Sequence, residues 1–373
     1  MDTLFLCRQL LRLFKTAFPN LHKPYLKMLS RIVVAFWFTD SIRLWRLASY
    51  LPFSSPLSTK NAYKALVRFL DKFPLDQEFW KNYVRLIFSL PYFRLKRRKY
   101  ITILIDATTI RDEFWILMGT ISFMGRGIPI YMKVWKDPNS SYDYWGRVER
   151  FLRELKGILP KRKRYEIVAD RGFQGDKLVR ICKDLEWDYL IRINGNYKVK
   201  IGDKEYIQLS LFKEGIYYDV VVGKRSKEVV NLVANEEVGE GGEEIKWYLK
   251  TSLMDKETAV RDYMRRMWIE EGIKDLKQYL KWESFTKKVP ESERVKKLLV
   301  ISILSYVLGL CMGVREEVVE GGIDGEEIGV KREEGIYRRF KNKIAGSIKN
   351  IKWLLVTIIV LVKQVYPKVL GIF

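Results

Sequence analysis

Apolar residues recur at helical spacing in the first hundred residues and predict a small helical unit. Between residues 32 and 37, apolar side chains follow one another at the spacing of successive helical turns. Asp40 or Ser41 can cap one following segment, and Ser58 can cap another over 62–73. Prolines separate the two segments, so we expect short helices that are distinct from one another.

The hydrophobic period changes at residue 100 and becomes typical of strands. Runs rich in β-branched and aromatic residues predict strands at 101–105, 114–123 and 128–135. Gly125 and Gly127 mark the turn between the last two runs. Three consecutive strands joined by short turns indicate an antiparallel meander.

Helices and strands alternate in the next segment. The pattern predicts a helix over 145–159, a strand over 166–169, a helix over 176–185 and a strand over 189–193. The order from residue 100 is therefore βββαβαβ, which favours an α/β fold.

A group of short strand-like pieces then breaks the alternation, and long helical patterns follow it. The pieces lie at 197–201, 216–222, 229–234 and 245–251. They predict a β-rich insertion at about 195–254, followed by one long helix over 256–281 and a second apolar helix over 292–311.

The C-terminal part is predicted to contain a linker and one more helix. Residues 316–334 are rich in Gly and Glu and are expected to form a loop. The apolar run at 353–362 falls short of the ~20 residues that a membrane helix needs. We therefore interpret it as a buried or partner-facing helix.

The charge balance is strongly basic and indicates a polyanionic partner. Lys and Arg number 68 against 45 Asp and Glu, which gives a net charge of +23, and 48% of the residues are hydrophobic. This is typical of a soluble protein with a basic surface. Residues 1–100 carry 19 basic and 5 acidic side chains, so a helical DNA-binding unit is favoured over a solvated face without ligand. The basic clusters at 94–99 and 161–164 would contact DNA along its length, unless they are merely solvated.

Several classes of site are excluded or disfavoured. The only histidine is His22, so zinc sites with several His ligands cannot form, and catalysis by a Ser-His-Asp or Cys-His set would require this one residue. Cys7, Cys182 and Cys311 form no C-x-x-C pair, which favours a reduced, intracellular protein over a disulfide framework. No glycine loop for nucleotide phosphates is present.

Two carboxylates stand out because each ends a predicted core strand. Asp106 follows the strand over 101–105, and Asp170 follows the strand over 166–169. A carboxylate in such a place costs free energy unless a cation or hydrogen bonds compensate it. The alternatives are an Asx turn at Asp106 and a helix N-cap at Asp170.

A third acid belongs to a polar stripe on the helix predicted over 256–281. At 100° per residue, Tyr263, Arg266, Glu270 and Lys277 share a stripe of about 60° beside the apolar face. The alternative is a surface ladder of ion pairs, since Arg266 and Glu270 are four residues apart.

These residues carry a resemblance to a known family. The spacing of the four stripe residues matches the Y-R-E-K signature of the IS4-type insertion-sequence transposases, which are DDE enzymes of the ribonuclease-H-like superfamily. The segments IDATTI, ADRGFQGDKLVRICKDLEWDYLIRI and YMRRMWIEEGIKDLK resemble the family's first-Asp strand, second-Asp strand and helix, and Glu helix. The resemblance covers residues 100–285 clearly and the N-terminal part loosely.

The resemblance implies a fold and a division into domains. It implies a ribonuclease-H-like α/β core, with a mixed five-stranded sheet and helices, at residues 100–290, interrupted by the β-rich insertion at about 195–254. Residues 1–99 would form the basic helical DNA-binding domain. Residues 291–373 would form a C-terminal helical region, a possible dimerisation element.

The resemblance also implies the site residues and the cofactor. Asp106, Asp170 and Glu270 would be the catalytic, metal-binding triad for Mg²⁺, for which Mn²⁺ can substitute, and oxygen ligands suit such cations. Glu271 is the competing carboxylate, but it lies about 80° off the stripe. The residues expected to contact DNA are Tyr263, Arg266, Lys277, Arg171, Arg192 and Trp268. Met267 stands where relatives often have Trp.

The implied function is DNA transposition by two-metal phosphoryl transfer. The protein would cut the ends of an insertion sequence and join them to target DNA, as a homodimer on double-stranded DNA. It would be a prokaryotic cytoplasmic, nucleoid-associated protein, without a membrane partner. The alternatives are a ribonuclease-H-like nuclease that does not join strands, and an inactive DNA-binding protein derived from a transposase.

Overall fold

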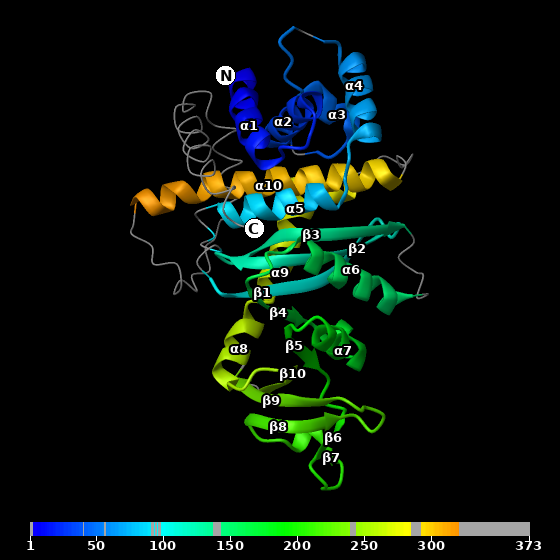
Figure 1. The fold of residues 1–373 in the computed structure, drawn as a ribbon, viewed down its shortest axis with the longest axis vertical. Helices are drawn as coiled ribbons and strands as arrows, with labels where there is room; N and C mark the ends of the chain where they lie inside the picture. Colours follow the sequence, from blue (N-terminus) through cyan, green and yellow to red (C-terminus); the bar gives the residue numbers. More distant parts are fainter. Residues whose placement is uncertain are drawn as a thin grey trace.

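The N-terminal part of the chain is helical in the computed structural model (Figure 1). The structure describes residues 3–320, except 40, 56, 91, 92, 94, 96, 97, 137–142, 239–243 and 285–291. The helices of this part are α1 (Thr3–Ala17), α2 (Lys23–Phe38), α3 (Leu44–Ser49), α4 (Thr59–Lys72) and α5 (Gln77–Ser89). Each buries an apolar face, as the hydrophobic period predicts.

One of the helix caps predicted for the N-terminal part is confirmed. The Ser58 hydroxyl accepts a hydrogen bond from the Asn61 N–H at 3.3 Å and caps α4. Ser41 does not cap α3, because α3 begins after Arg43 and the Ser41 hydroxyl accepts from the Arg43 N–H instead. Asp40 lies outside the described residues.

An antiparallel meander follows, as predicted. Its strands are β1 (Tyr100–Ile110), β2 (Phe114–Phe123) and β3 (Arg126–Lys136). β1 continues beyond the predicted end at 105, because the residues on both sides of Asp106 pair with β2. Asp106 therefore lies inside a strand, and the alternative of an Asx turn at this position is wrong.

The remaining core elements confirm the predicted βββαβαβ order. They are α6 (Tyr144–Ile158), β4 (Arg164–Ala169), the short 3₁₀ helix η2 (Arg171–Phe173), α7 (Asp176–Asp184) and β5 (Asp188–Ile193). The strand order is β3-β2-β1-β4-β5, with β1, β4 and β5 parallel. This is the mixed five-stranded sheet with helices that a ribonuclease-H-like core requires.

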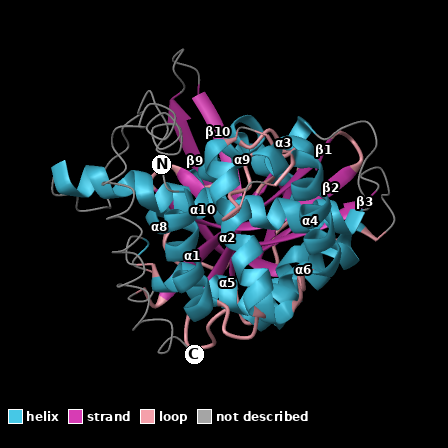
Figure 2. Cartoon of the chain, turned by 90° about the horizontal axis from the view of Figure 1, so that it is seen from above, coloured by secondary structure: helices cyan, strands magenta, loops and turns pink. Residues whose placement is uncertain are grey.

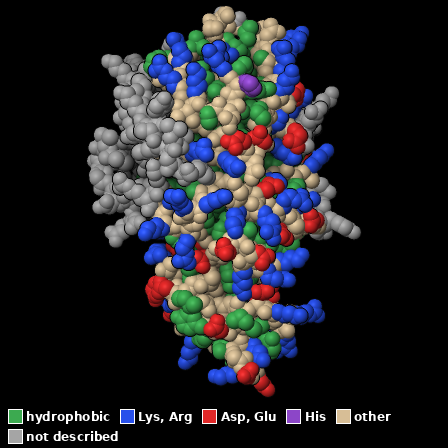
Figure 3. Space-filling model, in the orientation of Figure 1, with side chains coloured by type: hydrophobic (Ala, Val, Ile, Leu, Met, Phe, Trp, Pro, Cys, Tyr) green, Lys and Arg blue, Asp and Glu red, His purple; other side chains and the backbone are tan. Residues whose placement is uncertain are grey.

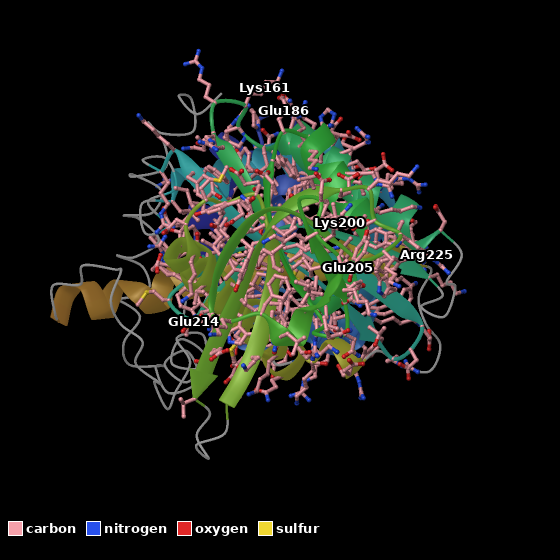
Figure 4. All side chains as sticks on the ribbon, turned by 90° about the horizontal axis from the view of Figure 1, so that it is seen from below. Lys161, Glu186, Lys200, Glu205, Glu214 and Arg225 are labelled. Carbon is pink, nitrogen blue, oxygen red and sulfur yellow. The ribbon has the colours of Figure 1, made fainter. Side chains whose placement is uncertain are left out.

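The inserted strands extend the core sheet. They are β6 (Lys198–Ile201), β7 (Ile207–Gln208), β8 (Gly215–Val222), β9 (Val229–Val238) and β10 (Glu244–Thr251), with η3 (Leu209–Leu211) between β7 and β8. β10 pairs with β5, so ten strands form one continuous sheet that ends at β7 (Figure 1). Viewed from this end, Lys200 and Glu205 are labelled close together, with Arg225 toward one side of the view and Glu214 toward the other, so this end carries charges of both signs (Figure 4).

The single helix predicted over 256–281 is wrong, because two helices occupy this segment. They are α8 (Lys256–Met264) and α9 (Met267–Tyr279). At the junction the Arg266 N–H donates to the Tyr263 carbonyl at 2.8 Å and the Ile269 N–H to the Arg266 carbonyl at 3.0 Å. These bonds span three residues, so the angular spacing of an ideal α-helix does not hold across the junction.

One long helix connects the N-terminal helices to the sheet. After η4 (Trp282–Ser284), α10 (Ser292–Glu320) runs farther than the predicted 292–311 and includes the first residues of the predicted loop. The Trp37 indole of α2 donates to the Ser305 carbonyl at 3.1 Å. Helices α1, α2, α4, α5 and α10 lie over the sheet when seen from above (Figure 2), and one hydrophobic core runs through these layers.

Some predictions fall outside these elements. The predicted helix over 353–362 and the rest of the loop predicted to reach 334 lie outside the described residues. No helix in the described part of the chain is long and apolar enough to cross a membrane. The boundaries of the three predicted domains stay a prediction.

Candidate active site

Two acids and an arginine lie side by side where β4 ends. Ala169 is the last residue of β4, and it pairs with Ile105 of β1 and with Ile191 of β5. Asp106, Asp170 and Arg192 each come one position after these paired residues, so they lie at the same level along three adjacent parallel strands. Because side chains alternate between the faces of a sheet, the three point to the same face.

That face is the one covered by α9. Ile105, the residue before Asp106, pairs with Gly119 of β2. A Cβ added at Gly119 would lie 3.4 Å from the Phe151 ring of α6, so this pair of residues faces α6. Asp106 belongs to the opposite face. There α9 packs closely on β3, because a Cβ built on Gly272 would lie 2.5 Å from the Gly127 carbonyl oxygen. This close packing brings the first turn of α9, with Glu270, over the acid pair.

The carboxyl of Asp106 has a perturbed environment. Burial raises its pKa from 3.8 to about 6, and the negative charges of Asp170 and Glu270 add to the rise. The hydrogen bond from the Ala107 N–H, at 2.8 Å, and the charge of Arg266 lower the pKa but do not restore its ordinary value. All three acids therefore belong to one electrostatic cluster.

Asp170 is held by the turn that follows it. Its Oδ1 accepts a hydrogen bond from the Gly172 N–H at 2.9 Å and caps η2. The expected alternative of a cap is thus realised on this short helix, whereas α7 begins after Gly175 without a side-chain cap. Arg171 donates to the Asn194 side chain at 3.4 Å and is exposed.

Glu270 forms an ion pair with Arg266. The guanidinium is 13% exposed and the carboxylate 53%, and their atoms are 2.5 Å apart. Arg266 also lies 5.9 Å from the centre of the Tyr263 ring, which packs on Trp247. The side chains of Tyr263 and Arg266 are thus fixed beside the third acid by packing and charge.

The other predicted residues of α9 have different surroundings. Lys277 donates to the Thr109 carbonyl at 3.0 Å and pairs with Glu283 at 3.1 Å, so it ties the end of α9 to the end of β1. Trp268 is half-buried, and Met267 is 63% exposed.

The competing carboxylate points elsewhere. Glu271 pairs with Arg126 at 3.8 Å and with Lys274 at 3.7 Å. Arg126 also binds Asp275, which accepts a hydrogen bond from the Tyr306 hydroxyl at 3.0 Å. Glu271 therefore belongs to a network that joins α9 to β3 and α10.

One residue near the acids was not predicted from the sequence. Tyr144 packs at 5.6 Å from the Trp115 ring and at 6.1 Å from the Phe173 ring. Burial raises the pKa of its hydroxyl, and so do the charges of Asp170 and Asp106. No sequence signal sets Tyr144 apart from the many other aromatic residues.

The two basic clusters predicted separately lie together. The Arg164 N–H donates to the Lys99 carbonyl at 2.9 Å, and the Lys163 ammonium donates to the Arg98 carbonyl. Lys99 and Arg164 are exposed. The described residues Arg98 and Lys99 therefore lie with Lys163 and Arg164 at the end of β1 and β4 away from the acid pair.

The donor set suits a hard divalent cation, although the acids are not arranged as a finished site. Within the described ranges, no three Asp, Glu, Cys or His side chains are grouped closely enough to hold a metal ion. Glu270 is instead paired with Arg266. The pKa of Asp106 is raised first by burial, and the negative charges of Asp170 and Glu270 add to the rise. Carboxylate oxygens are the ligands that hard divalent cations prefer.

Fold and site together define a nucleic-acid-processing α/β domain of the ribonuclease-H-like class. Residues 127–308 match the family model described as the transposase DDE domain. This match supports a DDE transposase, and the members of that family are metal-dependent DNA-cleaving enzymes. The matched region includes Asp170 and Glu270 and begins after Asp106. No curated protein matches the chain.

The environment of Asp106 predicts a pH-dependent stability. Because its pKa is raised from 3.8 to about 6, folding favours the protonated form, and stability falls as the pH rises from about 4 to about 6. A pKa difference of this size corresponds to about 3 kcal/mol in the free energy of unfolding. In EDTA, Asp106→Asn should melt at a higher temperature than the wild type at pH 7, with little difference at pH 4. An equal difference at both pH values would contradict this origin.

Proposed function

We propose that this chain cuts DNA at the ends of an insertion sequence and joins those ends to target DNA, with Asp106, Asp170 and Glu270 as the metal-binding triad. One observation carries the proposal. Asp106 within β1 and Asp170 directly after the neighbouring parallel strand β4 lie at the same level, and they face the helix that supplies the third acid. The IS4-type Y-R-E-K spacing supports the same assignment.

The three carboxylates would hold divalent cations, with Mg²⁺ as the proposed ion and Mn²⁺ as a substitute. When bound, such ions activate an attacking oxygen and stabilise the leaving oxygen of a phosphodiester. Glu271 is not proposed as a ligand, because it belongs to the network of Arg126 and Lys274, whereas Glu270 is the neighbouring acid whose charge acts on Asp106.

The neighbouring cations would hold the DNA backbone. Arg266 lies between Glu270 and Tyr263, and its guanidinium can bind a phosphate with two parallel hydrogen bonds. Lys277 would act as a point charge near the end of β1. The proposed contacts with weaker support are Arg171, Arg192 and Trp268.

We also propose a division of labour along the chain. Residues 1–99 would bind the element end, because basic side chains outnumber acidic ones over these helices (Figure 3). Residues 100–290 would carry the chemistry, with the insertion at about 195–254. Residues 291–373 would support a homodimer on double-stranded DNA. The IS4 subgroup is part of this proposal.

The test uses the DNA that flanks the gene. Inverted repeats that bracket the reading frame would be prepared as labelled duplexes, both uncut and with a free 3′-hydroxyl end, and mixed with a target plasmid. In Mg²⁺ or Mn²⁺ we expect cleavage of the uncut duplex and joining of the 3′-hydroxyl end to the plasmid, and no product in EDTA.

The other outcomes separate the alternatives. Metal-dependent cleavage without a joined product would indicate a nuclease. Binding of the repeats without cleavage in either metal would indicate an inactive DNA-binding protein. Either result contradicts the proposal.

A further inference from the structure

A buried lysine connects the inserted strands to the turn that carries Asp170. Lys250 lies in β10, and its side chain is only 2% exposed. Its ammonium group donates to Asp176 Oδ1 at 2.8 Å and to the Gln174 carbonyl at 3.3 Å. The same group lies 5.6 Å from the centre of the Tyr197 ring. An ammonium group this far from solvent is stable only with such partners.

Two of these partners belong to one short segment, which we call the Asp170 turn (residues 170–176). Within it, the Gln174 N–H donates to the Arg171 carbonyl at 3.3 Å, next to the bond from Gly172 to the Asp170 carboxylate. The Gln174 side chain accepts from the Asn194 N–H at 3.2 Å. The turn is therefore held from the side of β5 and β10.

We infer that Lys250 is a positioning residue that fixes the Asp170 turn, so that the inserted strands help to set the geometry of the metal-binding acids. This inference rests on the proposed role of Asp170. Mg²⁺ requires near-octahedral oxygen ligands, so a shift of the turn would weaken binding even where the fold is intact. Residues that orient metal ligands typically change affinity by about 10–100-fold when they are replaced.

The same strand offers a matched control. Lys246 is also in β10, but its side chain is 39% exposed and pairs across the sheet with Glu236 at 2.7 Å. Its replacement removes one positive charge from β10 without touching the Asp170 turn. Lys246→Met therefore separates a general effect of charge from an effect of position.

The experiment measures Mn²⁺ binding by the full chain without DNA, by electron paramagnetic resonance titration, together with the melting temperature. We expect Lys250→Met to weaken Mn²⁺ binding about 10–100-fold, and Lys246→Met to remain within about twofold of the wild type. The Mg²⁺ concentration for half-maximal cleavage should rise in parallel for Lys250→Met. Binding of the element end in EDTA should not change.

A second variant addresses misfolding, because Lys250→Met leaves Asp176 without its partner. The double variant Lys250→Met/Asp176→Leu removes both charges, so it should fold while Mn²⁺ affinity stays low. Wild-type Mn²⁺ affinity in either folded variant would overturn the inference.

Asp170→Asn separates this failure from failure of the proposed function. If Asp170→Asn abolishes Mn²⁺ binding and the Lys250 variants do not weaken it, only the role of Lys250 is wrong. If the wild type binds no Mn²⁺, or Asp170→Asn binds it normally, the proposed triad and the inference fail together.

Discussion

Replacing Asp106 or Asp170 with Asn, or Glu270 with Gln, should abolish DNA cleavage and strand joining while binding of the element end persists. Each change keeps the size of the side chain and removes one negative oxygen ligand. The loss of metal-assisted stabilisation, several kcal/mol, corresponds to a rate decrease of at least ~10³-fold. Cleavage of labelled end duplexes in Mg²⁺, with gel-shift binding in EDTA, measures both quantities.

Glu271→Gln provides the control for this series. It is the neighbour of Glu270 and carries the same charge, but its carboxylate faces Arg126 and Lys274. We expect its activity to remain within about threefold of the wild type, because a half-exposed ion pair contributes little. Full activity in Glu270→Gln together with loss in Glu271→Gln would show that the third acid is misassigned.

Gly272→Ala should destabilise the protein and reduce its activity together. The added Cβ would lie 2.5 Å from the Gly127 carbonyl oxygen, closer than packed atoms allow, so α9 must move away from β3. Overpacking of this kind costs about 1–3 kcal/mol. The displacement also moves Glu270, so cleavage should fall more than the loss of folded protein explains. Thermal melting and cleavage rates at a temperature well below the transition measure the two effects.

Gly157→Ala is the matched control for this substitution. Gly157 is also helical, in α6, and it is exposed. A Cβ there would meet only the Gln77 side-chain amide, which can rotate away. Because Ala favours a helix over Gly by up to ~1 kcal/mol, Gly157→Ala should be neutral or stabilising. Equal stability of the two variants would mean that α9 does not pack on β3 as described.

The sequence predicts the core elements well because their periods are strong and local. The run before Asp106 and the run before Asp170 are rich in aliphatic residues, and such runs form parallel strands that are buried on both faces. Their pairing places both acids at one level. β1 was predicted to end at residue 105 because the apolar run stops there, but it continues to Ile110. Thr108 and Thr109 stay extended because they pair with β2.

Contacts distant in sequence account for what could not be predicted. The break after Met264 has no Pro or Gly to signal it, and the helices on its two sides pack on different parts of the sheet, α8 near β9 and α9 on β3. The pairing of β10 with β5 depends on which edge of the core sheet is open, and hydrophobic period does not report this. Tyr144 comes close to the acids, and Lys250 to the Asp170 turn, only through such tertiary contacts.

The long helix α10 has a consequence for how a cut would be placed on DNA. Trp37 binds its backbone from the N-terminal side, and the buried Tyr306 of the same helix binds Asp275 of α9. The helices proposed to bind the element end and the helix that bears Glu270 are therefore both bonded to α10. The distance between the bound DNA sequence and the cut bond would then be set by packing inside the protein, and not by a flexible linker.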